Sequence, residues 1–292
     1  MSKRVTKQAL TGWLLVLPAV TVLAAFTHFP IVRTMVESLY SKGNPVRPSH
    51  FIGLDNYANF AADPVFWKVL GNNAIFALGT VPVSMALALV MALWVQSRSG
   101  KAVLRLAYFL PTMLPMIAAA NIWLFFYTPD IGLLDQLLGT FGLPGRNWLG
   151  DPATVMPCLM AMTIWKEAGF FMIFYLAALQ GMSPELREAA LLEGCGRFTY
   201  FRRVLFPLLM PTSLFVLVNA VLNAFKLVDH LFILTKGGPS NASNLLLYYI
   251  YEHAFAFYDL PAAAALTVVL LLGLAILAIS QFVFLDKRVH YR

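Results

Sequence analysis

Long apolar stretches separated by short polar segments dominate the hydropathy pattern of this chain. A helix needs about 20 apolar residues to cross the core of a bilayer. Six stretches are long enough: Gly12–Met35, Asn73–Val95, Val103–Tyr127, Thr154–Leu179, Pro207–Val228 and Ala262–Leu285. Several contain proline, which a membrane helix tolerates because neighbouring helices can satisfy the carbonyl groups it frees. The pattern therefore predicts an all-α membrane protein with six transmembrane helices.

The composition supports a membrane environment. Of the 292 residues, 60% are hydrophobic and only 12% are charged, whereas about 25% of the residues in a soluble protein are charged. A soluble domain of this size could not bury so much apolar surface in one core. The two cysteines, Cys158 and Cys195, have no metal-ligand spacing and give no support for a disulfide framework.

The distribution of basic residues predicts the orientation. With six spans both termini lie on one side, together with residues 96–105 and 180–206. That side carries thirteen Lys and Arg residues and the opposite side carries seven. Because cytoplasmic loops are enriched in Lys and Arg, we predict a cytoplasmic N-terminus at 1–11, a single transmembrane domain at 12–285 and a cytoplasmic tail at 286–292. The net charge of +7 follows this distribution, so it does not indicate a nucleic-acid partner.

The N-terminal apolar run also argues against a cleaved signal peptide. Basic residues precede it, as they do in a signal peptide. However, the run continues from Trp13 past Phe29 without a small-residue cleavage pattern. We therefore predict an uncleaved first helix.

The longest cytoplasmic loop, residues 183–206, has a helical pattern of its own. Ser183 is a candidate N-cap, and Pro184 suits the first helical position. Residues at helical spacing follow: Leu186, Ala189, Ala190 and Glu193. Gly194 and Gly196 end this helix, and a second amphipathic piece, Phe198–Leu205, leads into the next span. The loop is thus predicted to be a helix–turn–helix at the membrane surface.

The pattern of this loop leaves two interpretations open. The helix could lie in the lipid headgroups, with its apolar side chains directed into the bilayer. Alternatively, the small residues Ala189 and Ala190 beside Glu188 form a narrow face that would fit a groove in another protein.

Three strings resemble those of ABC importer permeases. Glu188-Ala189-Ala190, followed by Gly194 and then by Val204, Phe206 and Pro207, resembles the EAA loop, whose pattern is E-A-A, three residues, G, nine residues, I-x-L-P. Valine and phenylalanine here replace the isoleucine and leucine, and both exchanges keep an apolar residue. Phe51–Tyr57 (FIGLDNY) and Leu234–Pro239 (LTKGGP) resemble strings of the maltose and glycerol-3-phosphate branch of that family.

The resemblance implies a type I ABC importer permease fold in the bacterial inner membrane. It implies half of a translocation pathway for a carbohydrate or related polyol: a sugar, an oligosaccharide or a glycerol-phosphate compound. The implied partners are a second permease subunit in a heterodimer, two cytoplasmic ATPase subunits and an extracytoplasmic solute-binding protein. The resemblance assigns Glu188, Ala189, Ala190 and Gly194 to the coupling helix, which sits in a cleft of the ATPase.

We expect this chain to have no catalytic residues and no cofactor of its own. It contains no G-x-x-x-x-G-K-[ST] motif, so ATP and magnesium are expected to bind to the ATPase. Its five histidines are scattered and suggest no metal cluster.

Polar residues within the spans are candidates for the solute pathway, because such residues are costly in lipid and face a cavity or a partner. Lys166 and Glu167 lie in the fourth span. Asn219, Asn223 and Lys226 share one face of the fifth, and amides can both donate and accept hydrogen bonds to hydroxyl groups. Maltose-type permeases contact their substrate in this stretch, and the resemblance adds Ala220 and Ala224.

Each of these polar residues also has a simpler interpretation. The amides could hydrogen-bond between helices, Lys226 could extend to the membrane surface, and Lys166 could pair with Glu167 or with the second permease. Two other classes of protein remain as alternatives: a stand-alone secondary carrier or channel of six spans, and a membrane-embedded enzyme.

Overall fold

A computed structural model describes residues 2–43, 46–97 and 101–285, and the chain forms two compact units. The first comprises residues 1–63 and 250–271, and the second comprises residues 64–249 and 272–292. Within the described residues the secondary structure is helical, apart from one isolated bridge between Tyr40 and Phe51. This confirms the predicted all-α class.

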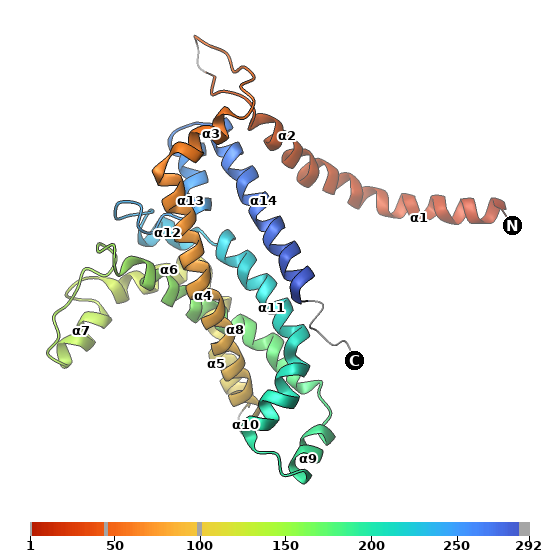
Figure 1. The fold of residues 1–292 in the computed structure, drawn as a ribbon, viewed down its shortest axis with the longest axis vertical. Helices are drawn as coiled ribbons and strands as arrows, with labels where there is room; N and C mark the ends of the chain where they lie inside the picture. The colour runs from red at the N-terminus through yellow and green to blue at the C-terminus, as the bar shows by residue number, and fades with distance from the viewer. Residues whose placement is uncertain (1, 44–45, 98–100, 286–292) are drawn as a thin grey trace. The chain divides into compact units, whose positions relative to one another are not determined.

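The first unit begins with a nearly continuous helical run (Figure 1). This run consists of α1 (Ser2–Leu23), a π-helical turn η1 (Ala24–His28) and α2 (Phe29–Glu37). Its apolar part, Thr11–Glu37, is 27 residues long and can cross a membrane. The unit also contains α3 (Asp55–Ala62), the π-helical turn η3 (Glu252–Ala256) and the first part of α14 (Leu260–Leu285).

The Phe51–Tyr57 string fixes the entry to α3. Gly53 takes a left-handed φ of +64°, which glycine adopts without steric cost. The amide of Asn56 donates to the carbonyl oxygens of Ser38 and Tyr40 at 2.8 and 2.9 Å, and the Tyr57 hydroxyl donates to Ser38 Oγ at 2.7 Å. The string therefore ties α3 back to the end of α2.

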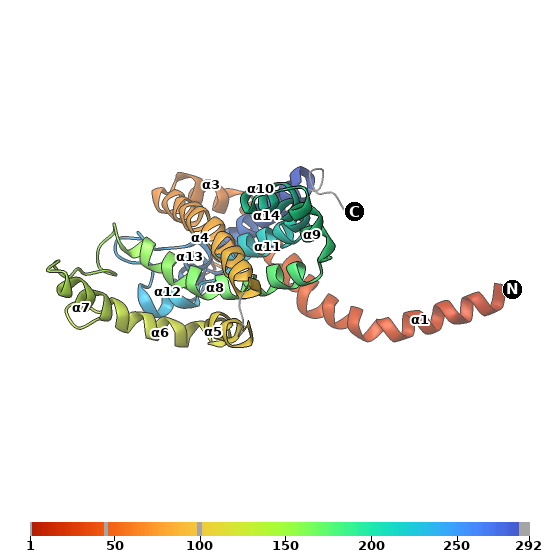
Figure 2. The same ribbon diagram turned by 90° about the horizontal axis from the view of Figure 1, so that it is seen from below.

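The second unit holds the remaining helices. They are α4 (Pro64–Ser97), α5 (Lys101–Met113), α6 (Met116–Tyr127), α7 (Leu133–Thr140), α8 (Val155–Gln180), α9 (Glu185–Leu192), α10 (Arg197–Tyr200), η2 (Phe201–Leu205), α11 (Phe206–Lys226), α12 (Asp229–Leu234) and α13 (Leu246–Tyr251), the last of which leads back to the first unit. In this unit α4, α8 and α11 pack against one another, α5 packs on α8, and α12 packs on α6 (Figures 1 and 2). Phe76, Leu159 and Leu209 are completely buried in the resulting core.

Five helical runs of the described residues are long and apolar enough to cross a membrane, and a bent pair makes a sixth if counted as one span. The bent pair lies where we predicted one of the six spans, Val103–Tyr127, and the structure adds a break in the middle of that span. The two halves, α5 and α6, meet at an angle of 97°. Pro115 precedes α6 in an extended conformation, with ψ of 143°, and its ring leaves no N–H to continue the ladder of α5.

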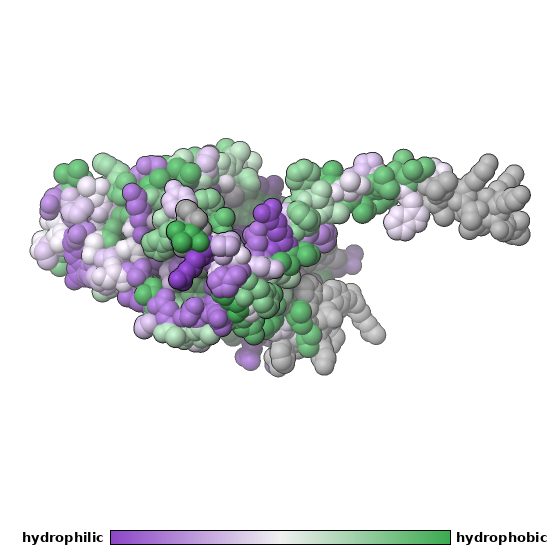
Figure 3. All heavy atoms as spheres, turned by 90° about the horizontal axis from the view of Figure 1, so that it is seen from above, coloured by the Kyte–Doolittle hydropathy of each residue, from purple (hydrophilic) through white to green (hydrophobic). Residues whose placement is uncertain are grey.

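The surface of these spans is apolar. Leu15, Leu78 and Val103 are 77%, 76% and 72% exposed, and Figure 3 shows apolar side chains in patches between polar ones on the face it draws. Exposed apolar surface of this extent on helices of spanning length is expected where lipid is the solvent.

Candidate functional site

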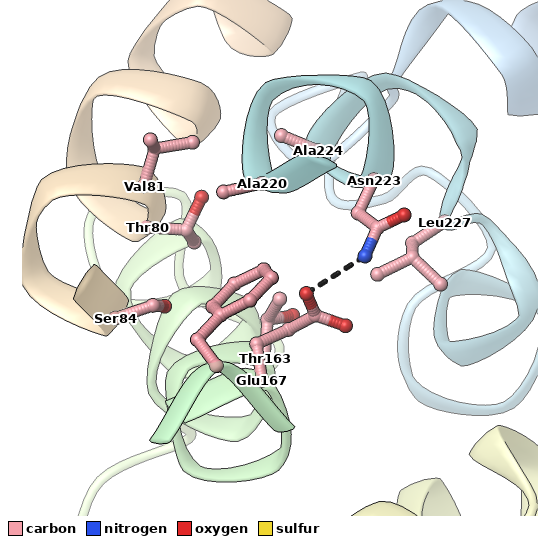
Figure 4. A pocket seen from close by; sticks show the side chains of 10 residues that line it. Thr80, Val81, Ser84, Thr163, Glu167, Ala220, Asn223, Ala224 and Leu227 are labelled. Carbon is pink, nitrogen blue, oxygen red and sulfur yellow. Dashed lines mark hydrogen bonds between the residues drawn. The ribbon is translucent and has the colours of Figure 1, made fainter. Parts of the chain in front are cut away.

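A small pocket lies between α4, α8 and α11 in the second unit (Figure 4). Its cavity volume is about 10 Å³, which is roughly the room that one water molecule needs. The side chains that line it come from α4 (Thr80, Val81, Ser84), α8 (Thr163, Glu167, Phe171), α11 (Ala220, Asn223, Ala224) and the residue that follows α11 (Leu227). The pocket thus brings polar groups from three packed helices to one place.

A hydrogen bond between Glu167 and Asn223 crosses this pocket. Asn223 Nδ2 donates to Glu167 Oε2 at 2.9 Å and so joins α11 to α8 (Figure 4). A partly buried carboxylate needs such a donor, because burying an unpaired polar group is costly. Arg33 and Glu37 form an ion pair in the described part of the chain, and no such pair joins Glu167 to its neighbour Lys166.

The side chain of Lys166 is bound to the break between α5 and α6 and does not line the pocket. Its ammonium donates to the carbonyl oxygens of Pro111 and Thr112, both at 3.2 Å, and to that of Leu114. Lys166 and Glu167 are adjacent in sequence, yet they link α8 to two different helices.

The other predicted pathway residues divide into two groups. Ala220 and Ala224 are buried and line the pocket, where their small side chains leave space beside Asn223. The Asn219 amide instead donates to the Phe215 carbonyl oxygen of its own helix at 2.7 Å. Lys226 is exposed at the end of α11 and is not a lining residue.

Three hydroxyl residues of the pocket were not foreseen from the sequence: Thr80, Ser84 and Thr163. Thr80 Oγ1 donates to the Phe76 carbonyl oxygen at 2.7 Å, and Thr163 Oγ1 makes the same kind of bond within α8. A hydroxyl that donates to its own helix still has lone pairs with which to accept. The spacing of Thr80 and Ser84, four residues apart in an apolar helix, is a signal that could have indicated them.

The segment 183–206 folds as a helix, a turn and a second helix, as predicted. Pro184 takes the N-cap position of α9, one residue later than the predicted Ser183, and the Glu185 N–H at the start of the helix donates to Ser183 Oγ at 3.3 Å. At the other end, the Gly194 N–H donates to the Leu191 carbonyl oxygen at 3.1 Å and the Cys195 N–H donates to that of Ala190 at 2.9 Å. This pair of bonds is a Schellman motif, which requires a left-handed residue after the helix, and Gly194 supplies it with φ of +71°.

Apolar side chains on this segment are uncovered in the second unit. Leu191, Leu192 and Phe198 are 63%, 90% and 75% exposed. Glu188 and Ala189 are exposed as well, whereas Ala190 is buried. Because this segment lies between two spans and is itself short and polar, its exposed leucines form an apolar surface of the kind that a partner covers.

Comparison with known proteins identifies similar chains along nearly the whole length. Residues 84–291 match the family described as binding-protein-dependent transport system inner membrane component. The chain is 32% identical to the lactose transport system permease protein LacF of Rhizobium radiobacter, over 93% of this chain and 92% of that protein. It is 31% identical to the sn-glycerol-3-phosphate transport system permease protein UgpA of Agrobacterium fabrum (strain C58 / ATCC 33970), over 96% of both chains.

A solved structure shares the fold. One chain in the crystal structure of a bacterial alginate ABC transporter, in complex with an alginate pentasaccharide-bound periplasmic protein, superposes with a TM-score of 0.85. The match covers 95% of this chain and 94% of that chain, at 19% sequence identity. The likeness of fold therefore extends over nearly the whole chain.

Proposed function

Because this chain belongs to the family of binding-protein-dependent transport system inner membrane components, we propose that it forms half of the pathway by which an ABC importer takes up a neutral, hydroxyl-rich solute of the carbohydrate class. It is a multi-pass protein of the bacterial inner membrane and a transport subunit. Permeases of this family work with a separate ATPase, which hydrolyses ATP, and with a binding protein. Membership therefore decides against a stand-alone carrier and against a membrane enzyme.

The Glu167–Asn223 pair carries the proposal on the solute. The pocket offers one carboxylate, one amide and several hydroxyl groups, and such groups match the donors and acceptors of a sugar. A carboxylate in this pocket disfavours the binding of a phosphate group, because like charges repel. The nearby ammonium of Lys166 is already bound to backbone carbonyls. The names of the relatives include both lactose and sn-glycerol-3-phosphate, and the pocket supports a solute of the first kind.

The pocket must widen to pass such a solute. Its volume of about 10 Å³ is far below that of typical ligand pockets, which are about 300–1,000 Å³. We infer that this conformation is closed at the pocket and that α11 separates from α4 and α8 during transport, as expected for a rigid-body rearrangement. A second, different permease subunit would supply the opposite wall of the pathway.

The segment 183–206 is proposed as the contact with the ATPase. Glu188, Ala189 and the exposed leucines of α9 would enter a groove of the ATPase, and Gly194 would fix the end of the helix. This is helix-in-groove recognition, and the 90% exposure of Leu192 supports it. The ATPase would bind ATP and magnesium, and this chain would need no cofactor. Both termini would then lie in the cytoplasm with this segment.

Reconstitution tests the pathway. The chain is assembled with its ATPase, a second permease and the binding protein in liposomes, and uptake of a neutral disaccharide is compared with uptake of glycerol 3-phosphate. We expect the disaccharide to enter in an ATP-dependent manner. We also expect Asn223→Leu to reduce uptake by about tenfold, the effect of losing roughly 1.4 kcal/mol of hydrogen bonding, without loss of assembly.

Asn121→Leu is the matched control for this experiment, because the Asn121 amide donates only to the Ile117 carbonyl oxygen of its own helix. Uptake that is unchanged in Asn223→Leu would remove this pocket from the pathway. Uptake of glycerol 3-phosphate but not of sugars would refute the proposed solute class, and uptake without the ATPase would refute the importer itself.

The coupling surface is tested separately. Leu192→Ser removes an exposed side chain that makes little contact within its own chain, so folding and membrane insertion should not change. We expect weaker binding of the ATPase in a pull-down and lower ATP hydrolysis by the complex. Phe141→Ser is the control, because Phe141 is also highly exposed, at 79%, but follows α7. Equal ATPase binding in the wild type and Leu192→Ser would contradict the assignment.

A further inference from the structure

The break between α5 and α6 leaves a cluster of backbone carbonyls at its bend. We use the term carbonyl cluster for the oxygens of Pro111, Thr112 and Leu114. The Leu114 N–H still donates to the Pro111 oxygen, at 3.3 Å, but Pro115 has no N–H to give to the cluster. Within a membrane, backbone groups without partners are costly, and non-helical backbone is tolerated only where protein or water satisfies it. The bend therefore needs donors from elsewhere.

Lys166, on α8, supplies these donors. Its ammonium donates to all three oxygens of the carbonyl cluster. An ammonium has three donors and no acceptor, so the three oxygens of the carbonyl cluster occupy all the donors of Lys166. The positive charge also lies at the C-terminal end of α5, where the helix dipole favours a cation.

Two further contacts lock α8 to α5 beside the carbonyl cluster. Thr112 Oγ1 donates to the Lys166 carbonyl oxygen at 3.1 Å, so that the link runs in both directions. One turn further along α8, Gly169 lies so close to the Tyr108 carbonyl oxygen that a Cβ atom would overlap it. The two helices are therefore held together closely at the bend.

We propose that Lys166 is a positioning residue, whose tethered ammonium occupies a cation site formed by the carbonyl cluster and thereby fixes the angle between α5 and α6. The next residue, Glu167, holds Asn223 of α11 in the pocket. One short stretch of α8 thus sets the broken span on one side and the pocket on the other. Lys166 acts on transport through the bend and does not contact the solute, in contrast to the role that the sequence suggested.

The first test measures the bend itself. Spin labels are attached at Leu106→Cys on α5 and Phe125→Cys on α6, two exposed positions, with Cys195 replaced by serine in the complete complex in lipid nanodiscs. We expect one narrow distance distribution in the protein with Lys166. In Lys166→Met, whose side chain is one atom shorter and uncharged, the distribution should become broad. Lys236→Met, at an exposed lysine outside the bend, is the control and should not change it.

The second test is chemical rescue with a small amine. Lys166→Ala removes three methylene groups and the ammonium, which propylammonium can replace in the cavity that remains. We expect Lys166→Ala to lower the maximal rate of uptake by about tenfold, since bonds to a charged group are lost, with the KM for the solute unchanged. Propylammonium should restore both the rate and the narrow distance distribution, whereas propanol, which has the same length but no charge, should restore neither.

The inference about Lys166 rests on the proposed function only in the uptake assay. The results can therefore show separately whether the inference fails or the proposed function fails. An unchanged distance distribution in Lys166→Met would overturn the inference. So would a raised KM with an intact bend, since that result would indicate contact with the solute. If the wild-type complex does not transport, the proposed function fails while the distances still test the bend. If Lys166→Met does not assemble, the yield of assembled Lys166→Ala is measured, and no recovery with propylammonium would overturn the inference.

Discussion

Replacing Gly194 by alanine tests how far the coupling segment depends on one backbone conformation. Gly194 ends α9 with φ of +71°, and the Schellman motif around it requires that value. A Cβ atom at this position would meet nothing within 4 Å. The substitution therefore adds no clash, and its whole effect arises from the backbone.

The size of the effect follows from the conformation. A residue other than glycine in the left-handed region costs roughly 1–2 kcal/mol, which corresponds to a factor of about 5–30 in an equilibrium constant. Helix α9 has only 8 residues, and an isolated helix of fewer than about 12 is marginal in water. The cost should therefore appear directly as a smaller population of the segment that can bind the ATPase. We expect the affinity of the permease complex for the ATPase to fall by about 5–30-fold.

The measurement is a titration of the ATPase subunit onto the permease complex in nanodiscs. Gly196→Ala is the matched control, because Gly196 is two residues away, has an ordinary φ of −66° and would also meet nothing within 4 Å. Gly194→Asn should lie between alanine and the wild type, because asparagine tolerates the left-handed region better than alanine. Equal affinities for Gly194→Ala and the wild type, or an equal loss in Gly196→Ala, would refute the reasoning.

The remaining predictions concern the second unit. Asn223→Leu should lower the melting temperature of the complex, because it leaves the Glu167 carboxylate without its donor. The double variant with Glu167→Leu should recover most of that loss, because replacing both partners is far less costly than replacing one. Equal melting temperatures of the single and double variants would contradict this. Gly169→Leu should destabilise the packing of α5 on α8 and increase proteolysis at the bend. Gly139→Leu should not, because a Cβ atom at Gly139 meets nothing within 4 Å. Similar proteolysis of the two variants would be inconsistent with close packing of α5 on α8. Hydrogen bonds from the Asp130 N–H and from the Trp148 indole lower the pKa of Asp135 below 3.8. The stability that this carboxylate gives its loop is therefore present above pH 3.8 and is lost as the pH falls through the lowered pKa. The fluorine NMR signal of 5-fluorotryptophan at Trp148 should report this loss. A change in that signal that is already complete at pH 5 would argue against the reasoning.

Neighbouring residues were sufficient to predict the spans and the coupling segment. Apolar stretches of spanning length, a serine hydroxyl that accepts from the start of α9 and the glycine stop at Gly194 are properties of adjacent residues, and the structure contains each of them. Membership of the transport family was likewise indicated by short strings of local sequence, and the comparisons confirm it. The contact roles of Glu188 and its neighbours, and the cytoplasmic side of the termini, stay predictions.

The position of the break in the third span could not be predicted in this way. Proline also stands inside α1, α4 and α11, at Pro18, Pro82 and Pro211, and those helices continue through it. The chain breaks at Pro115, where α8 supplies an ammonium that satisfies the freed carbonyls. A proline thus breaks one helix and is tolerated in others, because the neighbouring helix differs from case to case.

The sequence by itself determined which segments enter the membrane and which segment forms the polar helix–turn–helix between two of them, because periodicity, caps and turns depend on residues close together in the chain. Only the tertiary structure decided what the polar residues of the spans contact. Successive residues of a helix point about 100° apart, so Lys166 and Glu167 face different neighbours, one bound to α5 and the other to α11. Their partners are 52 to 56 residues away in sequence, and no local pattern records which distant helix packs on which side.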